Sequence, residues 1–367
     1  MFLSQTKLKI AKKLMLATLA MSAVACDKGG GSFSVLSDNS QFKQNVTFTP
    51  RKLDVLFVVD NSGSMATSQQ SLANNFPSFI DKFIDKGYDF RIAVTTTDAF
   101  YGDQFVSNGC SICNVEQTRF RSGVNPAVYV IDRADYDLAQ AGEEARLKSD
   151  FTLNVKVGTS GSGDERAFSS FKAALSSSLN VGFHRPDAFL AVVIVSDEED
   201  FSQSEYTMNE SYSNPNLFSV ASYKTFLDGF TGGVASQDYS VSAISISDQA
   251  CRDQLAGGSG GAQKVAIRYN QLVDLTGGTK NSICNPFDQT LDNISSQIMT
   301  EQKPVYTLDK KPIIASIRVV VDGVVVPQSS TDGWSYDAVD NTITINGLTY
   351  KPGANSAISI NFDPDLT

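Results

Sequence analysis

The stretch LDVLFVVDNSGSM, residues 53–65, decides the fold. Apart from Asp54, it begins with a continuous run of Leu, Val and Phe, which is typical of a strand buried on both faces of a parallel sheet. The run ends on Asp60, and Ser62 and Ser64 follow at alternate positions. Ligands of open α/β sheets bind outside the carboxyl ends of the strands. We therefore expect three oxygen-bearing side chains at a functional edge, where they suit a hard cation such as Mg²⁺ or Ca²⁺.

Strand and helix patterns alternate along the chain after this stretch. Apolar runs predict further strands at 89–98, near 128–131, and at 189–196, 239–247 and 282–284. Apolar residues at helical spacing predict helices at 66–86, near 135–149, and at 167–175, 219–229, 264–275 and 287–298, the first split or kinked at Pro77. This order predicts an α/β fold, a doubly wound, Rossmann-like, mostly parallel sheet with helices on both faces. The turn after the first strand lacks the Gly-x-Gly-x-x-Gly of a dinucleotide site, and the Gly-rich segment 257–261 is expected to be a loop.

The pattern changes to a period of two from about residue 304. Asp322-Gly323 is typical of a hairpin turn between two short strands. Strands are predicted at 317–321, 324–326, 334–336, 342–345 and 358–362. We therefore predict two domains, an α/β domain over 52–303 and a small all-β, sandwich-like domain over 304–367.

The first 25 residues are typical of a targeting segment. Four lysines precede an apolar stretch, 14–25, that is too short to span a membrane as a mature helix. Ala23-Val24-Ala25 then precedes Cys26, which resembles a bacterial lipoprotein signal with Cys26 as the lipidated first residue; plain secretory cleavage is the alternative. Residues 26–51 are rich in Gly, Ser, Asn and Gln, which predicts a flexible tether. The expected location is the bacterial cell envelope, at the inner or the outer membrane.

The charge of the chain argues against nucleic acid as a partner. The 367 residues carry a formal net charge of −10, with a pI near 4.7. Removing residues 1–25 takes away four Lys and no acidic residue, which leaves 26 basic and 40 acidic residues and a net charge of −14. Such a surface repels a phosphate backbone and attracts cations.

Four cysteines remain after Cys26, an even number that suits an oxidising compartment. Cys110 and Cys113 form one close pair, but zinc would need a second close pair and none exists. We predict one disulfide between Cys110 and Cys113 and another between Cys251 and Cys284.

Asp60, Ser62 and Ser64 resemble the first element of the metal-ion-dependent adhesion site in von Willebrand factor type A domains, which is Asp-x-Ser-x-Ser after the first strand. The stretches that begin at Asp200 and Asp238 fit the same pattern. Only Asp60 directly ends a buried strand and opens a helix, so we assign the site to it.

The other family positions are matched residue by residue. Asp197 matches the acid at the end of the fourth strand, although Ser-Asp-Glu stands here in place of the usual Thr-Asp-Gly. Thr159 is similar to the family's Thr in a Gly-containing loop before a helix, with Ser162 as its competitor. The resemblance implies a metal site of Asp60, Ser62, Ser64, Thr159 and Asp197.

The resemblance implies a function without catalysis. Neutral hydroxyl ligands leave a Mg²⁺ or Ca²⁺ ion, with Mn²⁺ as a third candidate, electron-poor and with one open position. An Asp or Glu of a protein partner can fill that position, which implies an envelope-anchored lipoprotein with an adhesion or assembly role. The alternatives are a structural lipoprotein with a vestigial or purely stabilising site, and a metal-dependent hydrolase. His184 is the only His, and no Gly-x-Ser-x-Gly motif occurs, so a catalytic triad has little support.

Overall fold

The computed structural model describes residues 42–107, 110–235, 237–259 and 263–366. The predicted signal peptide, residues 1–25, and the predicted lipidation site, Cys26, lie outside these ranges. Within them, no helix is both long enough and apolar enough to cross a membrane.

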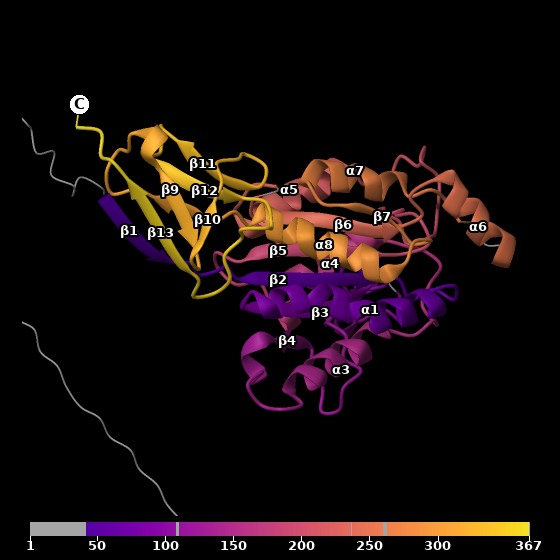
Figure 1. Ribbon diagram of the computed structural model, residues 1–367. Helices are drawn as coiled ribbons and strands as arrows, with labels where there is room; N and C mark the ends of the chain where they lie inside the picture. The colour runs from indigo at the N-terminus through magenta and orange to yellow at the C-terminus, as the bar shows by residue number, and fades with distance from the viewer. Residues whose placement is uncertain (1–41, 108–109, 236, 260–262, 367) are drawn as a thin grey trace, which may run out of the picture. The chain divides into compact units, whose positions relative to one another are not determined.

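A six-stranded sheet forms the centre of the α/β domain (Figure 1). Its strand order is β4-β3-β2-β5-β6-β7, and all neighbours are parallel except β3 and β4. The strands are β2 (Leu53–Val59), β3 (Phe90–Thr96), β4 (Val130–Asp132), β5 (Phe189–Val195), β6 (Tyr239–Ser245) and β7 (Lys280–Ser282). Every residue of β2, β5 and β6 is buried. The predicted doubly wound, mostly parallel sheet is therefore confirmed.

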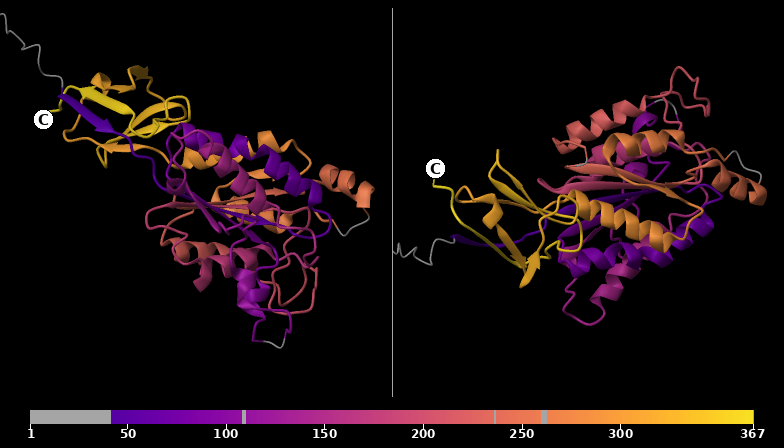
Figure 2. Two further views of the ribbon diagram at one scale, coloured as in Figure 1. Left: turned by 90° about the horizontal axis from the view of Figure 1, so that it is seen from below. Right: turned by 45° about the horizontal axis from the view of Figure 1, so that its top comes forward.

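Helices cover both faces of this sheet (Figures 1 and 2). Alternate residues of β2 enter two separate cores, since Val55, Phe57 and Val59 pack in one and Leu56 and Val58 in the other. The first core is completed by α1 (Ala66–Asp85), α3 (Glu143–Val155) and α8 (Phe287–Glu301), and the second by α4 (Ala167–Ser176), α5 (Val220–Thr231) and α7 (Ile267–Thr276). Both cores hold the carboxyl end of β2 in place.

Helix α1 runs through Pro77 without ending, so the predicted split is wrong. Proline lacks the N–H that would bond to the carbonyl oxygen of Ala73. The hydroxyl of Thr152, on α3, donates to that oxygen at 3.5 Å. Phe76, Phe79 and Ile80 are fully buried on the same helix, and their packing holds it together.

The observed helices differ from the predicted ones in three places. Helix α3 begins at Glu143 rather than near 135, because Gly142, with φ of 94°, precedes its first turn and Arg133–Asp135 form a separate 3₁₀ turn. Two helices were not predicted, α2 (Tyr101–Gln104) and α6 (Gln249–Ser259). Helix α6 includes the first three residues of the segment 257–261 that we expected to be a loop.

The β region comprises residues 42–48 and 305–366. Its two antiparallel sheets share one apolar core. One has the order β1-β13-β9-β10 and the other β11-β12-β8. The predicted sandwich-like arrangement is confirmed, as is the hairpin at Asp322-Gly323, where both residues have positive φ, 49° and 84°. The strands are β1 (Phe42–Thr47), β8 (Val305–Thr307), β9 (Arg318–Val321), β10 (Val324–Val326), β11 (Gly333–Asp337), β12 (Thr342–Asn346) and β13 (Ala357–Phe362).

The tether prediction is wrong for residues 42–47. These residues form β1, which pairs with β13, and the rings of Phe42 and Phe362 lie 5.2 Å apart. Residues of β1 alternate between half-buried and exposed, the pattern of a strand with one solvated face. The chain thus enters the β region before it builds the α/β domain, and Gln41–Thr367 form one compact unit.

Candidate metal centre

Asp60 directly follows β2, and its backbone is held from two sides. Its N–H donates to Val195 O at 2.9 Å, which continues the pairing with β5. Its carbonyl oxygen accepts from Gln69 Nε2 at 2.9 Å, and the same amide group donates to Gly158 O at 2.7 Å. Gln69 therefore ties the turn after β2 to the loop that carries Thr159, although the sequence pattern did not single it out.

A continuous series of hydrogen bonds joins four of the five predicted metal ligands. The Ser62 N–H donates to Asp60 Oδ1 at 2.7 Å, and the hydroxyl oxygens of Ser62 and Ser64 are 3.2 Å apart. The Ser64 hydroxyl donates to Asp197 Oδ1 at 2.9 Å. Two loops that follow neighbouring strands, β2 and β5, thus bring two carboxylates and two hydroxyls together.

Ser196 fixes the orientation of the Asp60 side chain. Its hydroxyl donates to Asp60 Oδ2 at 2.7 Å, while Asp60 Oδ1 accepts from the backbone. Each carboxylate oxygen keeps a further lone pair after these bonds. The carboxylate is therefore oriented in advance and can still accept from a cation.

The fifth predicted ligand, Thr159, does not join this series. Its side chain is exposed, and we find no hydrogen bond from its hydroxyl within the described ranges. Its loop nevertheless lies against the turn after β2, since Gly161 N–H donates to Asn61 O at 2.8 Å. A Cβ on Gly161 would lie 2.3 Å from Asn61 Nδ2, so this approach requires glycine.

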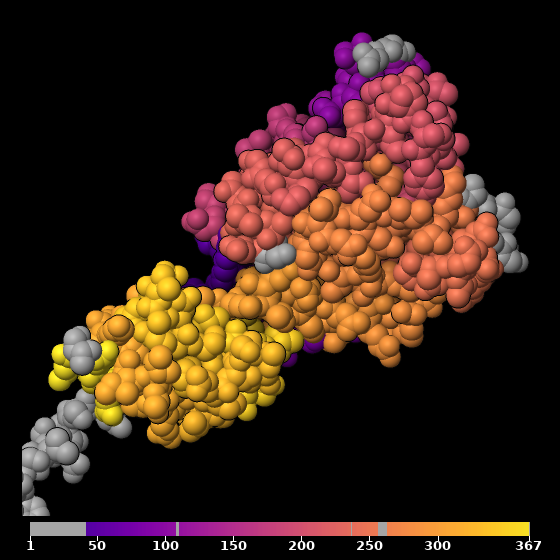
Figure 3. Space-filling view, turned by 90° about the horizontal axis from the view of Figure 1, so that it is seen from above, coloured from indigo at the N-terminus to yellow at the C-terminus, as the bar shows by residue number. Residues whose placement is uncertain are grey.

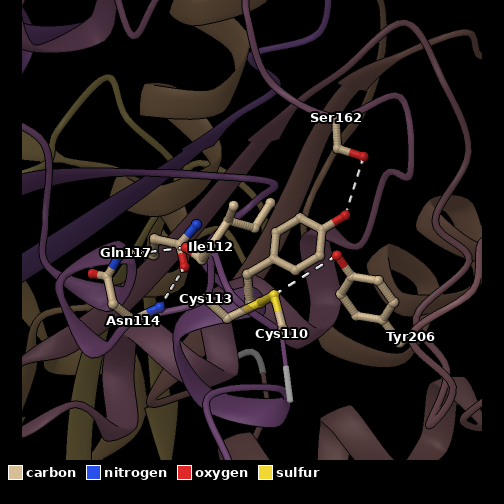
Figure 4. Close-up of a disulfide and its surroundings, with 8 residues drawn as sticks. Cys110, Ile112, Cys113, Asn114, Gln117, Ser162 and Tyr206 are labelled. Carbon is tan, nitrogen blue, oxygen red and sulfur yellow. Dashed lines mark hydrogen bonds between the residues drawn. A yellow bond between two sulfur atoms is a disulfide. The ribbon is translucent and has the colours of Figure 1, made fainter. Parts of the chain in front are cut away.

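Ser162, the competitor of Thr159, is already engaged. Its hydroxyl accepts from Tyr101 OH at 3.3 Å, beside the Cys110–Cys113 disulfide (Figure 4), and from Asp164 N–H at 3.0 Å. Its own N–H donates to Asp98, which also accepts from Asn61 Nδ2 at 3.0 Å. Ser162 and Asp98 thus support the turn after β2 from the side.

Several buried acidic groups differ in whether an arginine pairs with them. Away from the site, three of them pair with an arginine: Asp54 with Arg185 at 2.8 Å, Asp164 with Arg166 at 2.6 Å and Asp200 with Arg268 at 3.1 Å. At the site, no ion pair with Lys, Arg or His is found in the described part of the chain for Asp60, Glu165, Asp197 or Glu198. At the carboxyl edge of the sheet, three buried carboxylates and the half-buried Glu198 therefore have no positive partner within the described residues.

The pKa values of the carboxylates of Asp60, Asp197 and Glu198 are all raised. Burial raises the pKa of Asp60 from 3.8 to about 6, against the hydrogen bonds from Ser62 and Ser196, which lower it. Burial, and then the charges of Asp60 and Asp197, raise the pKa of Glu198 to about 7. Burial also raises the pKa of Asp197. A nearby cation would lower all three pKa values.

The other two Asp-x-Ser-x-Ser stretches have structural roles. Asp200 accepts from the Ser202 hydroxyl at 2.7 Å and pairs with Arg268. Asp238 pairs with Arg51 at 2.9 Å and accepts from Val234 N–H. The choice of Asp60 over these two by its position at a strand end agrees with this geometry.

Both predicted disulfides are confirmed, Cys110 with Cys113 and Cys251 with Cys284. In the described part of the chain, no group of three or more His, Cys, Asp or Glu side chains is arranged to hold a metal ion by itself. An ion at Asp60 would therefore have to use the hydroxyls of Ser62 and Ser64 as well.

Comparison with known proteins gives structural likeness without a sequence match. No protein-family model matches the chain, and neither does any curated protein. The pilus adhesin SpaC from Lactobacillus rhamnosus GG, in an open conformation, is 11% identical over 88% of this chain and 40% of its own, with a TM-score of 0.40. A von Willebrand factor type A protein from Catenulispora acidiphila is 13% identical over 89% of this chain and 61% of its own, with a TM-score of 0.35. The pilus adhesin RrgA from Streptococcus pneumoniae is 11% identical over 88% of this chain and 58% of its own, with a TM-score of 0.32.

The chain thus spans between 40% and 61% of these three structures. Their identities and TM-scores are too low to carry a functional argument, so the function is argued from the residues of the site.

Proposed function

We propose that this protein is an envelope-anchored lipoprotein that binds a protein partner through a divalent cation, in an adhesion or assembly role. The cation is Mg²⁺ or Ca²⁺, with Mn²⁺ as a third candidate, and Asp60, Ser62, Ser64 and Asp197 hold it. The observation that carries the proposal is that one series of hydrogen bonds joins Asp60, Ser62, Ser64 and Asp197, while neither carboxylate has an ion-pair partner in the described part of the chain.

The donor set fits a hard cation. Carboxylate and hydroxyl oxygens are the ligands that Mg²⁺ and Ca²⁺ prefer, and such sites often keep water molecules as well. The Ser64 hydroxyl now donates to Asp197 and can turn its lone pairs toward an ion. Thr159, exposed on the neighbouring loop, stays a candidate for a further ligand.

A partner has room beside this site. A cavity of about 690 Å³ adjoins it, with Ser64 and Asp197 on its wall. The first three turns of α1, the start of α8, the segment between β7 and α8, and residues 254, 255 and 263 line the rest. Hydroxyl and amide side chains such as Ser68, Ser71 and Asn75 are prominent among them. An Asp or Glu of the partner would complete the coordination of the ion, and the adjoining residues of the partner would occupy the cavity.

The test is capture of envelope proteins on the immobilised mature protein, with Ca²⁺ or Mg²⁺, with EDTA, and with EDTA followed by excess ion. Support requires a partner that EDTA releases, that added ion restores, and that Asp60→Ala does not retain. Asp340→Ala, a change at an exposed residue of the β region, is the matched control and should retain the partner.

Two outcomes would support the alternatives. Ion binding without any ion-dependent partner favours a purely stabilising site, and no effect of any of the three ions on thermal unfolding favours a vestigial site. Ion-dependent turnover of phosphoesters by the wild type, lost in Asp60→Ala, favours a hydrolase.

A further inference from the structure

The Cys110–Cys113 disulfide takes no part in the candidate ion site. Its Cys-x-x-Cys spacing is that of redox-active thiol pairs, and the two residues between the cysteines are exposed. Cys110 is half-buried, whereas Cys113 is 8% exposed and packs with Phe100 and Phe105. Of the two cysteines, Cys110 is therefore the more accessible to a reagent from solvent.

A hydroxyl donor lies beside the sulfur of the more accessible cysteine. Tyr206 OH is 3.7 Å from Cys110 Sγ, and the hydroxyl is the donor because a disulfide sulfur carries no proton (Figure 4). Tyr206 is 48% exposed, and its ring lies 5.3 Å from that of Phe105. The same hydroxyl can donate to a Cys110 thiolate, and a hydrogen bond to the charged form of a group favours that form. Cys110 is thus placed both to be attacked and to leave as a thiolate.

The short loop of this disulfide lets the protein lose the bond and stay folded. Cys110 and Cys113 are three positions apart, whereas Cys251 and Cys284 are 33 apart. In the chain-entropy model a disulfide stabilises the fold more when its loop is longer, so loss of the shorter loop lowers the folding equilibrium constant about 30-fold less. Reduction of this pair therefore costs the fold little beside reduction of the other pair.

Contacts that do not need the disulfide hold the segment on its carboxyl side. Asn114 follows Cys113 and caps the 3₁₀ turn Val115–Thr118. Its N–H donates to Gln117 Oε1, and its side chain accepts from a backbone N–H of the turn, both at 3.0 Å. Helix α2 lies close against it, because a Cβ on Gly102 would be 2.7 Å from Asn114 O. We expect Cys113 to stay in place after reduction, where the disulfide can form again.

We propose that the Cys110–Cys113 disulfide is a thiol–disulfide exchange site whose substrate is a dithiol. One thiolate of the dithiol attacks Cys110 Sγ, which forms a mixed disulfide and releases Cys113 as a thiolate. The second thiolate of the dithiol attacks the dithiol sulfur of the mixed disulfide and releases Cys110. The dithiol gives up two electrons and two protons and becomes a disulfide, and the two cysteines take them up and become thiols. This chemistry needs no cation and does not depend on the proposed function.

The first experiment equilibrates the folded wild type with glutathione buffers of increasing reduced fraction, in which two glutathione thiols stand in for the dithiol. Free thiols are then alkylated and assigned by mass spectrometry. Structural disulfides of secreted proteins resist reduction by glutathione, whereas labile and catalytic ones do not. Cys110 and Cys113 should therefore become alkylated together, in buffers that leave the other disulfide oxidised and the protein folded. The proposal is overturned if this bond stays oxidised in every buffer in which the protein is folded, or if the other disulfide is reduced first.

The second experiment tests the order of attack with two matched variants. Cys113→Ser keeps only the Cys110 thiol of the pair, and Cys110→Ser keeps only the Cys113 thiol. With oxidised glutathione, Cys110 should form a mixed disulfide about 10-fold faster than Cys113, because it is the more accessible thiol and has a hydroxyl donor beside it. Equal rates, or faster reaction of Cys113, overturn the assignment of Cys110 as the attacked residue. If either variant does not fold, the equilibrium measurement on the wild type decides alone.

Discussion

The Ser64 hydroxyl donates to a carboxylate oxygen of Asp197 over 2.9 Å, although 133 positions separate the two residues. Ser64 belongs to the turn after β2 and Asp197 to the turn after β5, and these two strands are parallel neighbours. The register of the sheet therefore sets the distance between the two turns. A cation at this point would bind both turns at once and lock the carboxyl ends of the two central strands together.

Ser64→Ala should abolish stabilisation by the ion. A ligand at 100 times its Kd stabilises a folded protein by about 2.7 kcal/mol, and this gain should disappear in the variant because one oxygen ligand is lost. Without ion, the loss of a hydrogen bond to a charged group should cost about 1.5–3 kcal/mol. Thermal unfolding with and without Ca²⁺ measures both effects. Ser204→Ala removes the last Ser of another Asp-x-Ser-x-Ser stretch, and an equal loss there would contradict the assignment.

The ion-free protein should be more stable near pH 5 than near pH 8. Burial raises the pKa of Asp60 to about 6 and that of Glu198 to about 7, so the folded state binds more protons than the unfolded state between about pH 4 and 7. Stability then falls as the pH rises through this window. For Asp60 alone the loss between pH 5 and pH 8 is about 1.4 kcal/mol, because about one pH unit of the raised range lies above pH 5 and each unit corresponds to 1.36 kcal/mol.

Urea unfolding in EDTA at pH 5 and pH 8 tests this direction. Asp60→Asn should reduce the difference between the two values of the free energy of unfolding. Saturating Ca²⁺ should reduce it as well, because the cation favours the charged carboxylates. A difference between pH 5 and pH 8 that is the same in the wild type and in Asp60→Asn would rule out an uncompensated carboxylate at this position.

The two disulfides should differ in their contribution to stability. Cys251 and Cys284 close a loop of 33 residues, whereas Cys110 and Cys113 are three positions apart. The chain-entropy model gives about 4 kcal/mol for the longer loop and about 1–2 kcal/mol for the shorter. The Cys251→Ala/Cys284→Ala variant should therefore lose more free energy of unfolding than Cys110→Ala/Cys113→Ala. Denaturant unfolding of the two variants, each the control of the other, gives the order, and the reverse order would contradict the model.

The parts of the site that the sequence predicts are those set by local order. Asp60 and Asp197 each follow a strand of apolar residues, and parallel strands bring such ends to one edge. Ser62 and Ser64 follow within one turn. That these four side chains lie close together could be predicted from the chain, because their positions depend only on where two strands end.

The parts that the sequence does not predict depend on distant partners. Strand β1 is short and polar, and it is held by β13 from the other end of the chain. Glu165 lies in the run Asp164-Glu165-Arg166, and the order of residues does not say which acid takes the arginine. Only the fold decides this, by turning Arg166 toward Asp164.

The yellow β region adjoins the orange part of the α/β domain (Figure 3). Lys351, in the β region, is a buried amine. It is 3% exposed, and its ammonium group donates to the backbone oxygen of Gln302, at the end of α8. The Lys86 ammonium donates to Lys351 O at 2.9 Å, and Lys86 O accepts from Ala354 N–H at 2.7 Å. Burial, and then the charges of Lys86 and Lys303, lower the pKa of Lys351 from 10.5 to about 7.

This lowered pKa predicts that Lys351→Met removes a rise in stability between pH 7 and pH 10. In that range the unfolded state holds a proton on Lys351 that the folded state has lost, so the wild type becomes more stable as the pH rises. The rise should be on the order of 3 kcal/mol.

The measurement is the free energy of unfolding in urea at pH 7 and pH 9.5 for the wild type, Lys351→Met and the exposed Lys311→Met. Since other groups titrate in the same range, the informative quantity is the difference between wild type and variant, which should grow with pH for Lys351→Met and stay constant for Lys311→Met. A constant difference for both would mean that the Lys351 amine keeps its proton in the fold and that solvent reaches it.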